Sequence, residues 1–188
     1  DRLQHPPRGR GKMVGVCFMG DLWHPDVPWA ALWAVMNRAY ERPLNDWLFL
    51  TKRPQNISVP GWRWPKNFWL GVTCENQARA DERIPILLDI AVRWVSLEPL
   101  LGPVDLTRIG GDRFGWFRTD ALHGLYYAEA YANGEGRAEW VTKPTQKLQW
   151  VVVGPETGPG ARPCEAAWID DVVDQCREAR VPCFVKSA

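Results

Sequence analysis

The stretch FWLGVTCEN, residues 68–76, decides the fold of this chain. It opens with a short and nearly continuous apolar run, which is typical of a strand buried on both faces of a sheet. Two polar residues, Glu75 and Asn76, close the stretch. A helical pattern then extends from about Gln77 to Ile90, and Pro85 is expected to bend it. The stretch therefore predicts a strand–helix unit with polar side chains at the carboxyl end of the strand.

Further apolar runs repeat this pattern along the chain. They are Met13–Met19, Trp47–Leu50, Val92–Leu97, Trp150–Val153 and Cys183–Val185. Amphipathic helices are predicted over Trp29–Tyr40 and Trp168–Ala179. Asp26 followed by Pro28 is typical of a helix start, with a capping carboxylate and a proline in the first turn. Strands that alternate with helices favour a parallel sheet with right-handed crossovers.

The length of the chain limits the kind of parallel sheet that it can form. A closed eight-unit barrel typically needs about 250 residues, whereas this chain has 188 residues. We therefore predict an α/β fold, with an incomplete TIM-like (β/α) barrel of six mostly parallel strands. An ordinary doubly wound sheet is the alternative.

Residues 107–147 interrupt the pattern with many glycine and aromatic residues. Within them, Leu125–Trp140 fits a helix or a hairpin equally well. An irregular stretch of this length in a compact domain is usually a functional lid or an inserted subdomain. We predict a single α/β domain over residues 1–188, with residues 1–12 as an N-terminal arm and residues 107–147 as an insertion or lid.

Composition bears on localisation and on partners. The net charge of +1 weakens a role in binding nucleic acid but does not exclude it, because such proteins usually carry a basic surface. No apolar run approaches about 18 residues, so no membrane span is predicted, and no charged-then-apolar leader is visible. The five cysteines lack CxxC and CxxxC spacings, which predicts reduced thiols in a cytoplasmic protein without a local metal motif.

Each of the apolar runs is followed by a charged residue. These residues are Asp21, Lys52, Glu75, Glu98, Glu156 and Lys186. The carboxyl ends of parallel strands share one face of the sheet, so these side chains are predicted to ring one opening. At any single position the simpler reason is that strand ends meet water. As a set, however, close carboxylates and amines perturb one another's pKa values, which suits acid–base catalysis or the clamping of a charged substrate.

Candidate roles follow from charge and position. The candidate catalytic residues are Glu75, Glu98, Glu156 and Lys186. The candidate substrate-binding residues are Asp21, His24, Lys52, Arg53, Asn76 and Arg162. One His beside one Asp is a weak metal signal, so no metal ligand is assigned. The segment Gly154–Pro163, GPETGPGARP, forms either a rigid turn or a shaped loop whose backbone N–H groups approach an anion, with Arg162 completing the site.

Several segments resemble, in the same order, those of a known family. Residues 20–28 (GDLWHPDVP) are similar to its SDLFHPDVP stretch, and residues 50–54 match its LTKRP stretch. The further matching segments are Leu70–Asn76, Ser96–Leu106, Gly154–Pro163 and Phe184–Lys186. Together they resemble the phage-associated family named after phage gene products 37 and 68, a domain of unknown function. The resemblance covers most of the chain except roughly residues 107–147.

The resemblance implies a radical-SAM-like partial barrel in a phage or prophage protein. In that enzyme class a three-Cys segment, on the loop after the first strand, holds a [4Fe–4S] cluster that cleaves S-adenosylmethionine. That segment would lie upstream of the residues seen here. The chain also departs from the family at Pro155 and at Ser187-Ala188. We therefore expect this chain to hold no cofactor by itself, whereas a full-length relative would use S-adenosylmethionine and the cluster.

Three functions remain open at this point. The first is a radical-SAM-like enzyme domain, incomplete in this chain, that acts on a nucleotide, a nucleic acid or a peptide. The second is a non-catalytic binding module on a degenerate barrel, in which residues 107–147 contact a protein or a nucleic acid. The third is a cofactor-free α/β enzyme that uses the carboxylates directly.

Overall fold

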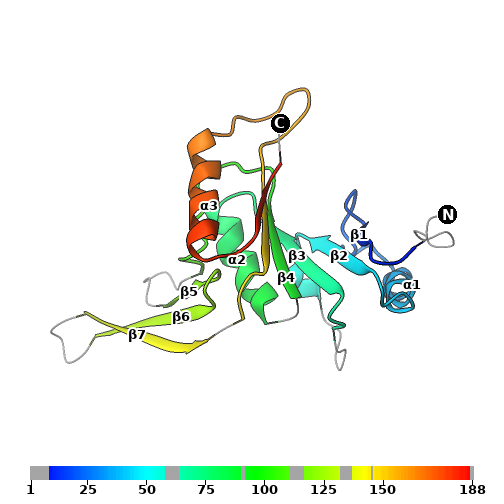
Figure 1. Cartoon of the computed structure of the whole chain (residues 1–188), viewed down its shortest axis with the longest axis horizontal. Coiled ribbons are helices and arrows are strands. Elements are labelled where there is room, and N and C mark those ends of the chain that lie inside the picture. Colours follow the sequence, from blue (N-terminus) through cyan, green and yellow to red (C-terminus); the bar gives the residue numbers. More distant parts are fainter. Residues whose placement is uncertain are drawn as a thin grey trace.

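A curled sheet of parallel strands forms the centre of the molecule (Figure 1). The computed structural model describes residues 9–57, 64–89, 92–110, 117–131, 137–144 and 146–186. The strands of this sheet are β1 (Met13–Val16), β2 (Asp46–Thr51), β3 (Phe68–Thr73), β4 (Val92–Leu97), β8 (Trp150–Val153) and β9 (Cys183–Val185). They lie side by side in that order, and every neighbouring pair is parallel.

The strand order decides between the two predicted architectures. Each strand lies next to the preceding strand of the same sheet. A doubly wound sheet instead contains a point at which the strand order reverses. The prediction of an incomplete barrel of six parallel strands is therefore confirmed, and the doubly wound alternative is wrong.

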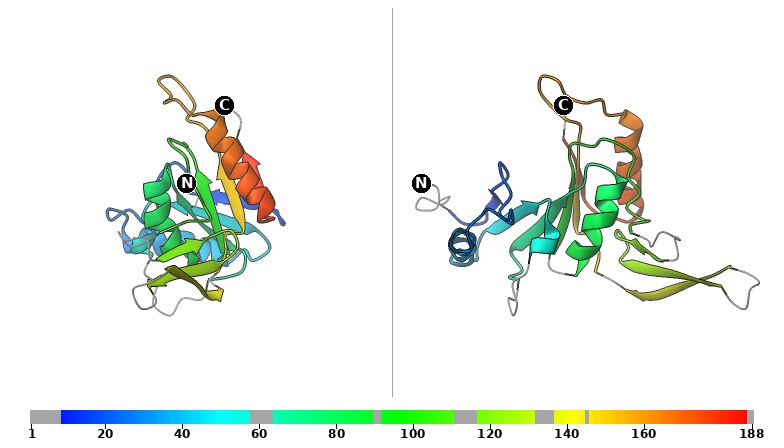
Figure 2. Two further views of the ribbon diagram at one scale, coloured as in Figure 1. Left: turned by 90° about the vertical axis from the view of Figure 1, so that its left-hand side faces the viewer. Right: turned by 180° about the vertical axis from the view of Figure 1, so that it is seen from behind.

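Helices connect the strands and cover the outer face of the sheet. They are α1 (Trp29–Tyr40), α2 (Gln77–Leu88) and α3 (Ala166–Glu178), and a 3-10 turn, η1 (Pro54–Asn56), follows β2. Figure 2 shows α2 and α3 along the same side of the sheet. Buried helix residues such as Met36, Leu87 and Val172 join Phe49 and Leu70 of the strands in one apolar core. None of the helices described is both long enough and apolar enough to cross a membrane.

The inner face of the sheet carries a second, smaller apolar cluster. Its residues are Leu48, Leu50, Trp69, Trp94, Trp150 and Val152. Trp94 on β4 lies opposite Trp150 on β8, and their rings stack with centroids 5.2 Å apart. Gly71 on β3 leaves room for this arrangement, because a Cβ atom there would lie 2.3 Å from Cε2 of Trp94. Bulky aromatic side chains thus line the hollow side of the half-barrel.

The stretch between β4 and β8 contains a separate antiparallel sheet. Its strands are β5 (Phe117–Asp120), β6 (Leu125–Tyr131) and β7 (Arg137–Pro144). Strands β6 and β7 settle the choice between helix and hairpin in favour of the hairpin. In Figure 1 this sheet projects near the end of the main sheet where β8 begins, away from the loop that follows β8. Its role as a lid stays a prediction, and residues 1–8 of the N-terminal arm lie outside the described residues.

Two local predictions around β1 are wrong. The apolar run Met13–Met19 is not one buried strand, because β1 ends at Val16 and Met19 is fully exposed. Cys17 has a φ of 55°, and the Gly20 N–H donates to the Cys17 carbonyl at 3.0 Å, so the chain turns there. Asp26 does not cap α1. The N-cap residue is Pro28, which has no side chain that can accept a hydrogen bond.

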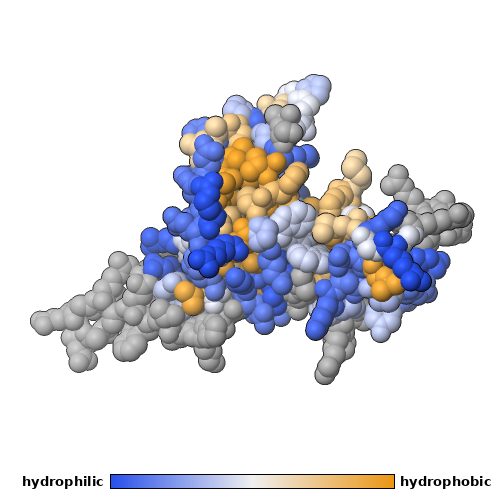
Figure 3. Space-filling model, in the orientation of Figure 1, coloured by the Kyte–Doolittle hydropathy of each residue, from blue (hydrophilic) through white to orange (hydrophobic). Residues whose placement is uncertain are grey.

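The two edge strands of the main sheet leave apolar side chains exposed. On β9, Phe184 and Val185 are exposed over 54% and 46% of their surface, and Figure 3 shows apolar surface gathered over this region. On β1, Met13 is 58% exposed. The helices bury the outer face of the sheet, whereas its two edges remain open within the described residues.

We predict that Gly71→Ala destabilises the protein by about 1–3 kcal/mol, because the added methyl group forces Trp94 out of its stack with Trp150. Urea denaturation followed by far-UV circular dichroism measures the change in the free energy of unfolding. Gly20→Ala is the matched control, because no atom lies within 4 Å of a Cβ atom at that position. Equal stabilities for the two variants would contradict the proposed packing.

Candidate functional site

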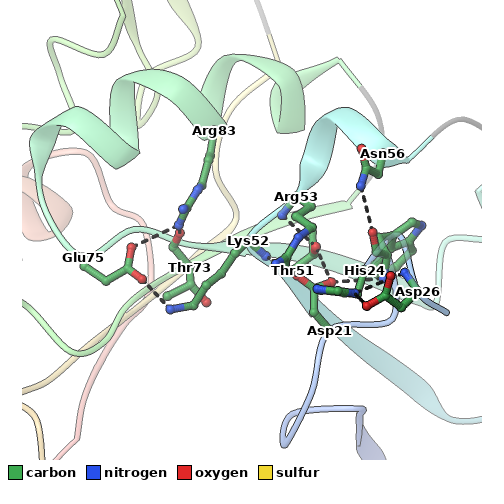
Figure 4. Close-up of polar contacts among 11 residues, drawn as sticks. Asp21, His24, Asp26, Thr51, Lys52, Arg53, Asn56, Thr73, Glu75 and Arg83 are labelled. Carbon is green, nitrogen blue, oxygen red and sulfur yellow. Dashed lines mark hydrogen bonds and ion pairs between the residues drawn. The ribbon is translucent and has the colours of Figure 1, made fainter.

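Charged side chains gather at the carboxyl ends of the parallel strands, along one edge of the sheet that we call the rim (Figure 4). The rim residues are Asp21, Lys52, Arg53, Glu75, Glu98, Glu156, Arg162 and Lys186. Most of these side chains are paired with one another. The pairs differ in burial and in the number of hydrogen bonds, so they differ in what they can do chemically.

Asp21 joins the loop after β1 to the end of β2. Its carboxylate accepts hydrogen bonds from the Thr51 hydroxyl at 2.7 Å and from the Trp23 N–H at 3.0 Å. It also accepts from the Lys52 N–H at 3.0 Å and from the Arg53 guanidinium at 2.8 Å. Burial acts to raise the pKa of Asp21, but these hydrogen bonds outweigh it and lower the pKa. Both carboxylate oxygens thus accept two hydrogen bonds each, and these bonds hold two strand ends together. Asp21 therefore has a structural role.

Glu75, directly after β3, holds two cations. Its carboxylate lies 2.5 Å from Nζ of Lys52 and 3.0 Å from Nη1 of Arg83. Burial acts to raise the pKa of Glu75. It is outweighed by the hydrogen bond from Lys52, by a backbone hydrogen bond and by the positive charges of Lys52 and Arg83, so the pKa is lowered. Glu75 therefore stays ionised and fixes Lys52 and Arg83 beside each other, as Figure 4 shows.

Glu98 after β4 and Lys186 after β9 form a second ion pair that reaches across β8. Gly154, which follows β8, lies between them in the sheet. A Cβ atom at Gly154 would lie 3.0 Å from Cβ of Lys186, so the missing side chain makes room for the lysine. Both partners keep contact with solvent, with side chains 24% and 48% exposed. This ion pair joins two of the four predicted catalytic residues.

Glu156 and Arg162 pair within the loop that follows β8. The guanidinium donates from Nε at 2.7 Å and from Nη2 at 2.9 Å to the two carboxylate oxygens. These hydrogen bonds lower the pKa of Glu156 to about 2. Gly158 and Gly160 adopt φ values of 101° and 79°, which side chains rarely allow, so the glycines shape the loop around the pair.

Two cavities open at the rim and share Lys52. The first, of about 340 Å³, is lined by Phe18, Gly20, Asp21, Leu50, Thr51, Lys52, Arg53 and Thr73. The second, of about 370 Å³, is lined by Lys52, Glu75, Asn76, Arg79, Arg83, Pro99, Leu101 and Arg162. Backbone hydrogen bonds support the second cavity, since Leu101 N–H donates to Glu75 C=O at 2.8 Å.

The structure thus brings together most of the predicted site residues and adds two. Lys52, Glu75, Asn76 and Arg162 line one cavity, and Asp21, Lys52 and Arg53 line the other. Glu98, Glu156 and Lys186 form pairs at strand ends but line neither, and His24 bonds with its neighbour Asp26 instead.

Arg79 and Arg83 are the additional residues. Sequence reasoning missed both because they lie inside α2, beyond the strand end. The two arginines are four positions apart in the helix that Asn76 caps, so they lie on the same face of it. That spacing is the signal in the sequence that could have pointed to them.

The described part of the chain does not fit a [4Fe–4S] cluster. It brings no three His, Cys, Asp or Glu side chains together in a way that could hold a metal ion. All five cysteines lie in this part and are free thiols. Cys74, directly before Glu75, is buried, and burial raises its pKa well above the usual range. Iron–sulfur clusters need several thiolates close together, which these residues do not supply.

We predict that Glu75→Gln lowers the free energy of unfolding by about 1–3 kcal/mol at pH 7, because it leaves the buried Arg83 without its anionic partner. The pKa of Glu75 is lowered by folding, so its stabilising contribution exists above the unfolded pKa of about 4.3 and is lost as the pH falls through the folded value. The difference between wild type and variant should therefore shrink on acidification. Denaturation at several pH values measures it.

Glu41→Gln is the control for this prediction, because Glu41 forms an exposed pair with Arg38. We expect it to change stability by less than about 0.5 kcal/mol at every pH. A Glu75→Gln effect no larger than this would mean that Glu75 does not compensate the charge of Arg83.

Comparison with known proteins yields a single match. A family model described as "Protein of unknown function (DUF5131)" matches residues 1–188. No curated protein and no solved structure matches the chain. The family match confirms one part of the resemblance, namely a domain of unknown function. Because the model covers the whole length of the chain, the protein belongs to the DUF5131 family.

Proposed function

We propose that this chain is the barrel domain of a radical-SAM-like enzyme, of phage or prophage origin and cytoplasmic, that acts on a nucleotide bound at the rim. The observation that supports it best is the pair of adjacent rim cavities that share Lys52. In parallel α/β barrels, substrates bind at the carboxyl ends of the strands. The sequence resemblance is the support for the enzyme class and the phage origin, and the free cysteines fit a reducing compartment.

The rim residues divide into two groups in this proposal. Glu75 and Glu156 are held as anions by arginine partners, so they position cations and do not exchange protons near neutral pH. Glu98 and Lys186 form a pair that keeps contact with solvent, with the lysine ammonium donating to the carboxylate. This pair lies on the rim outside the lining of the two cavities. We propose it for proton exchange with a part of the substrate that extends beyond them.

A [4Fe–4S] cluster does not fit the described residues, so no step is assigned to it. In an enzyme of this class the cluster ligands would come from outside the described part of the chain. The residues on the rim would bind and orient the substrate and supply the proton.

A non-catalytic binding module is the second candidate, and the lack of a three-ligand group in the described residues favours it. In that case the partner would contact the sheet β5–β7. There Phe117 and Tyr126 stack with centroids 6.0 Å apart, and the Arg118 guanidinium lies 4.9 Å from the ring centre of Tyr127. Phe117 is exposed and the other three residues are partly buried. Aromatic and cationic groups of this kind are typical of protein and nucleic-acid contacts.

Hydrogen exchange with mass spectrometry distinguishes the two candidates. We predict that a panel of nucleoside monophosphates and S-adenosylmethionine contains at least one ligand that slows exchange at the rim, in residues 50–56, 74–79 and 154–163. Lys52→Gln should reduce this protection, because Lys52 lines both cavities, whereas Phe117→Ala should leave it unchanged. Protection confined to residues 117–131 would contradict the rim proposal and support the binding module.

We also predict that anaerobic reconstitution of this chain with iron and sulfide yields no stoichiometric cluster, because the described residues bring no three thiols together in a way that could hold one. Iron and sulfide analysis, with the absorption spectrum, measures the outcome. A full complement of iron retained after desalting, and lost on Cys74→Ala or Cys164→Ala, would show that the described thiols do assemble a cluster.

A further inference from the structure

We propose that the second rim cavity, next to the start of α2, binds the phosphate group of a mononucleotide whose base lies in the first cavity. This inference rests on the proposed function and narrows its substrate to a phosphate monoester. Four features support it: the charges that line the cavity, a buried arginine, the start of the helix and the neighbouring aromatic surface.

The cavity is lined by an excess of positive charge. Among the described side chains that line it, Lys52, Arg79, Arg83 and Arg162 are cationic and Glu75 is the carboxylate. Two of the cations are also held by exposed carboxylates, Arg79 by Glu82 at 2.5 Å and Arg162 by Glu156. The Arg79–Glu82 pair is exposed and contributes little free energy, so the Arg79 guanidinium can turn towards a bound anion at small cost. Arg162 is held by both oxygens of Glu156, and its remaining donor capacity faces the cavity only in part.

Arg83 adds a buried positive charge to the cavity lining. It is only 7% exposed, and its Nη1 donates to the Thr73 carbonyl at 2.6 Å and to Glu75 at 3.0 Å. Its Nε is buried without a hydrogen-bond partner. A buried guanidinium is costly unless its charge and donors are matched, so an additional anion beside it would lower that cost. Arginine is well suited to phosphate because its planar donors match two phosphate oxygens.

The start of α2 adds to the positive potential in the second cavity. Asn76 caps the helix by accepting the Arg79 N–H at 3.1 Å, and both residues line the cavity. The helix spans Gln77–Leu88, so its amino end carries a partial positive charge that favours anions. A phosphate in the cavity would therefore face the helix end and the side chains of Arg79 and Arg83 together.

The first cavity offers a surface for an aromatic base. Phe18 is 49% exposed and packs against Trp94 with ring centroids 6.0 Å apart, so one side of its ring is supported and the other remains accessible. Leu50 extends the apolar wall of this cavity. Because Lys52 lines both cavities, a single small ligand can place its ring beside Phe18 and its phosphate beyond Lys52.

A mononucleotide fits this arrangement better than a long nucleic acid. The net charge of the chain is +1, which does not supply the extended basic surface that a phosphate backbone requires. The positive charge is instead concentrated in one cavity at the rim. The terminal phosphate of an oligonucleotide shares the same chemistry, so the test includes it.

Isothermal titration calorimetry of the whole chain tests the inference with four nucleoside monophosphates, the four matching nucleosides and a 5′-phosphorylated dinucleotide. For the base that binds best, we expect the monophosphate to bind about tenfold to a hundredfold more tightly than the nucleoside, which is the range for charge-assisted hydrogen bonds. Higher salt should reduce this ratio. Tighter binding of the dinucleotide than of the monophosphate would overturn the assignment to a mononucleotide.

Arg79→Gln and Arg162→Gln are the informative variants, because both residues are exposed enough to be replaced without loss of the fold. Each variant should bind the monophosphate about tenfold more weakly and bind the nucleoside with unchanged affinity. Arg38→Gln on α1 should change neither affinity. Equal binding of nucleoside and monophosphate would overturn the phosphate site but leave the proposed nucleotide function standing. If no ligand of the panel binds or protects the rim from exchange, both proposals fail.

Discussion

The shared direction of the six strands is the constraint on which the rest of the structure depends. Each strand is hydrogen-bonded in parallel to the strand before it in the sheet. The residues that follow the strands therefore all lie at the same edge. Lys52 and Glu75, separated by 23 positions in the chain, meet at 2.5 Å because β2 and β3 end side by side. An antiparallel neighbour would send one of these residues to the opposite edge, and neither rim cavity would form.

The rim charges serve two different purposes, and burial separates them. Asp21 and Glu75 are largely buried, accept several donors each and hold loops or cations in place. Arg162 and Lys186 lie in more exposed pairs, in which both partners keep contact with solvent. A rim built from both kinds keeps its shape while it offers charge to a substrate. Glu75, which the sequence suggested as catalytic, and Asp21, which it suggested as substrate-binding, therefore also support their neighbours.

Sequence reasoning reached the parallel half-barrel because the apolar runs are short, recur regularly and end in polar residues. It also placed Lys52, Glu75 and Arg162 at one edge, since that follows from strand direction. It did not find Arg83, because a helix residue enters the rim only through tertiary packing. It extended the first strand to Met19, because composition cannot show the left-handed turn at Cys17. The hairpin of β6 and β7 stayed undecided because its residues lack a clear period.

The strand order also has a consequence for folding. Strands β2, β3 and β4 each pair with the strand before them in the chain, so each of these pairings closes a connection that contains at most one α-helix. The pairing of β4 with β8 instead spans the whole inserted sheet, and closing that longer loop costs more chain entropy. During synthesis the first four strands can therefore assemble as they emerge, while β8, α3 and β9 dock last. Arg162 and Lys186 would join the rim only at this final stage.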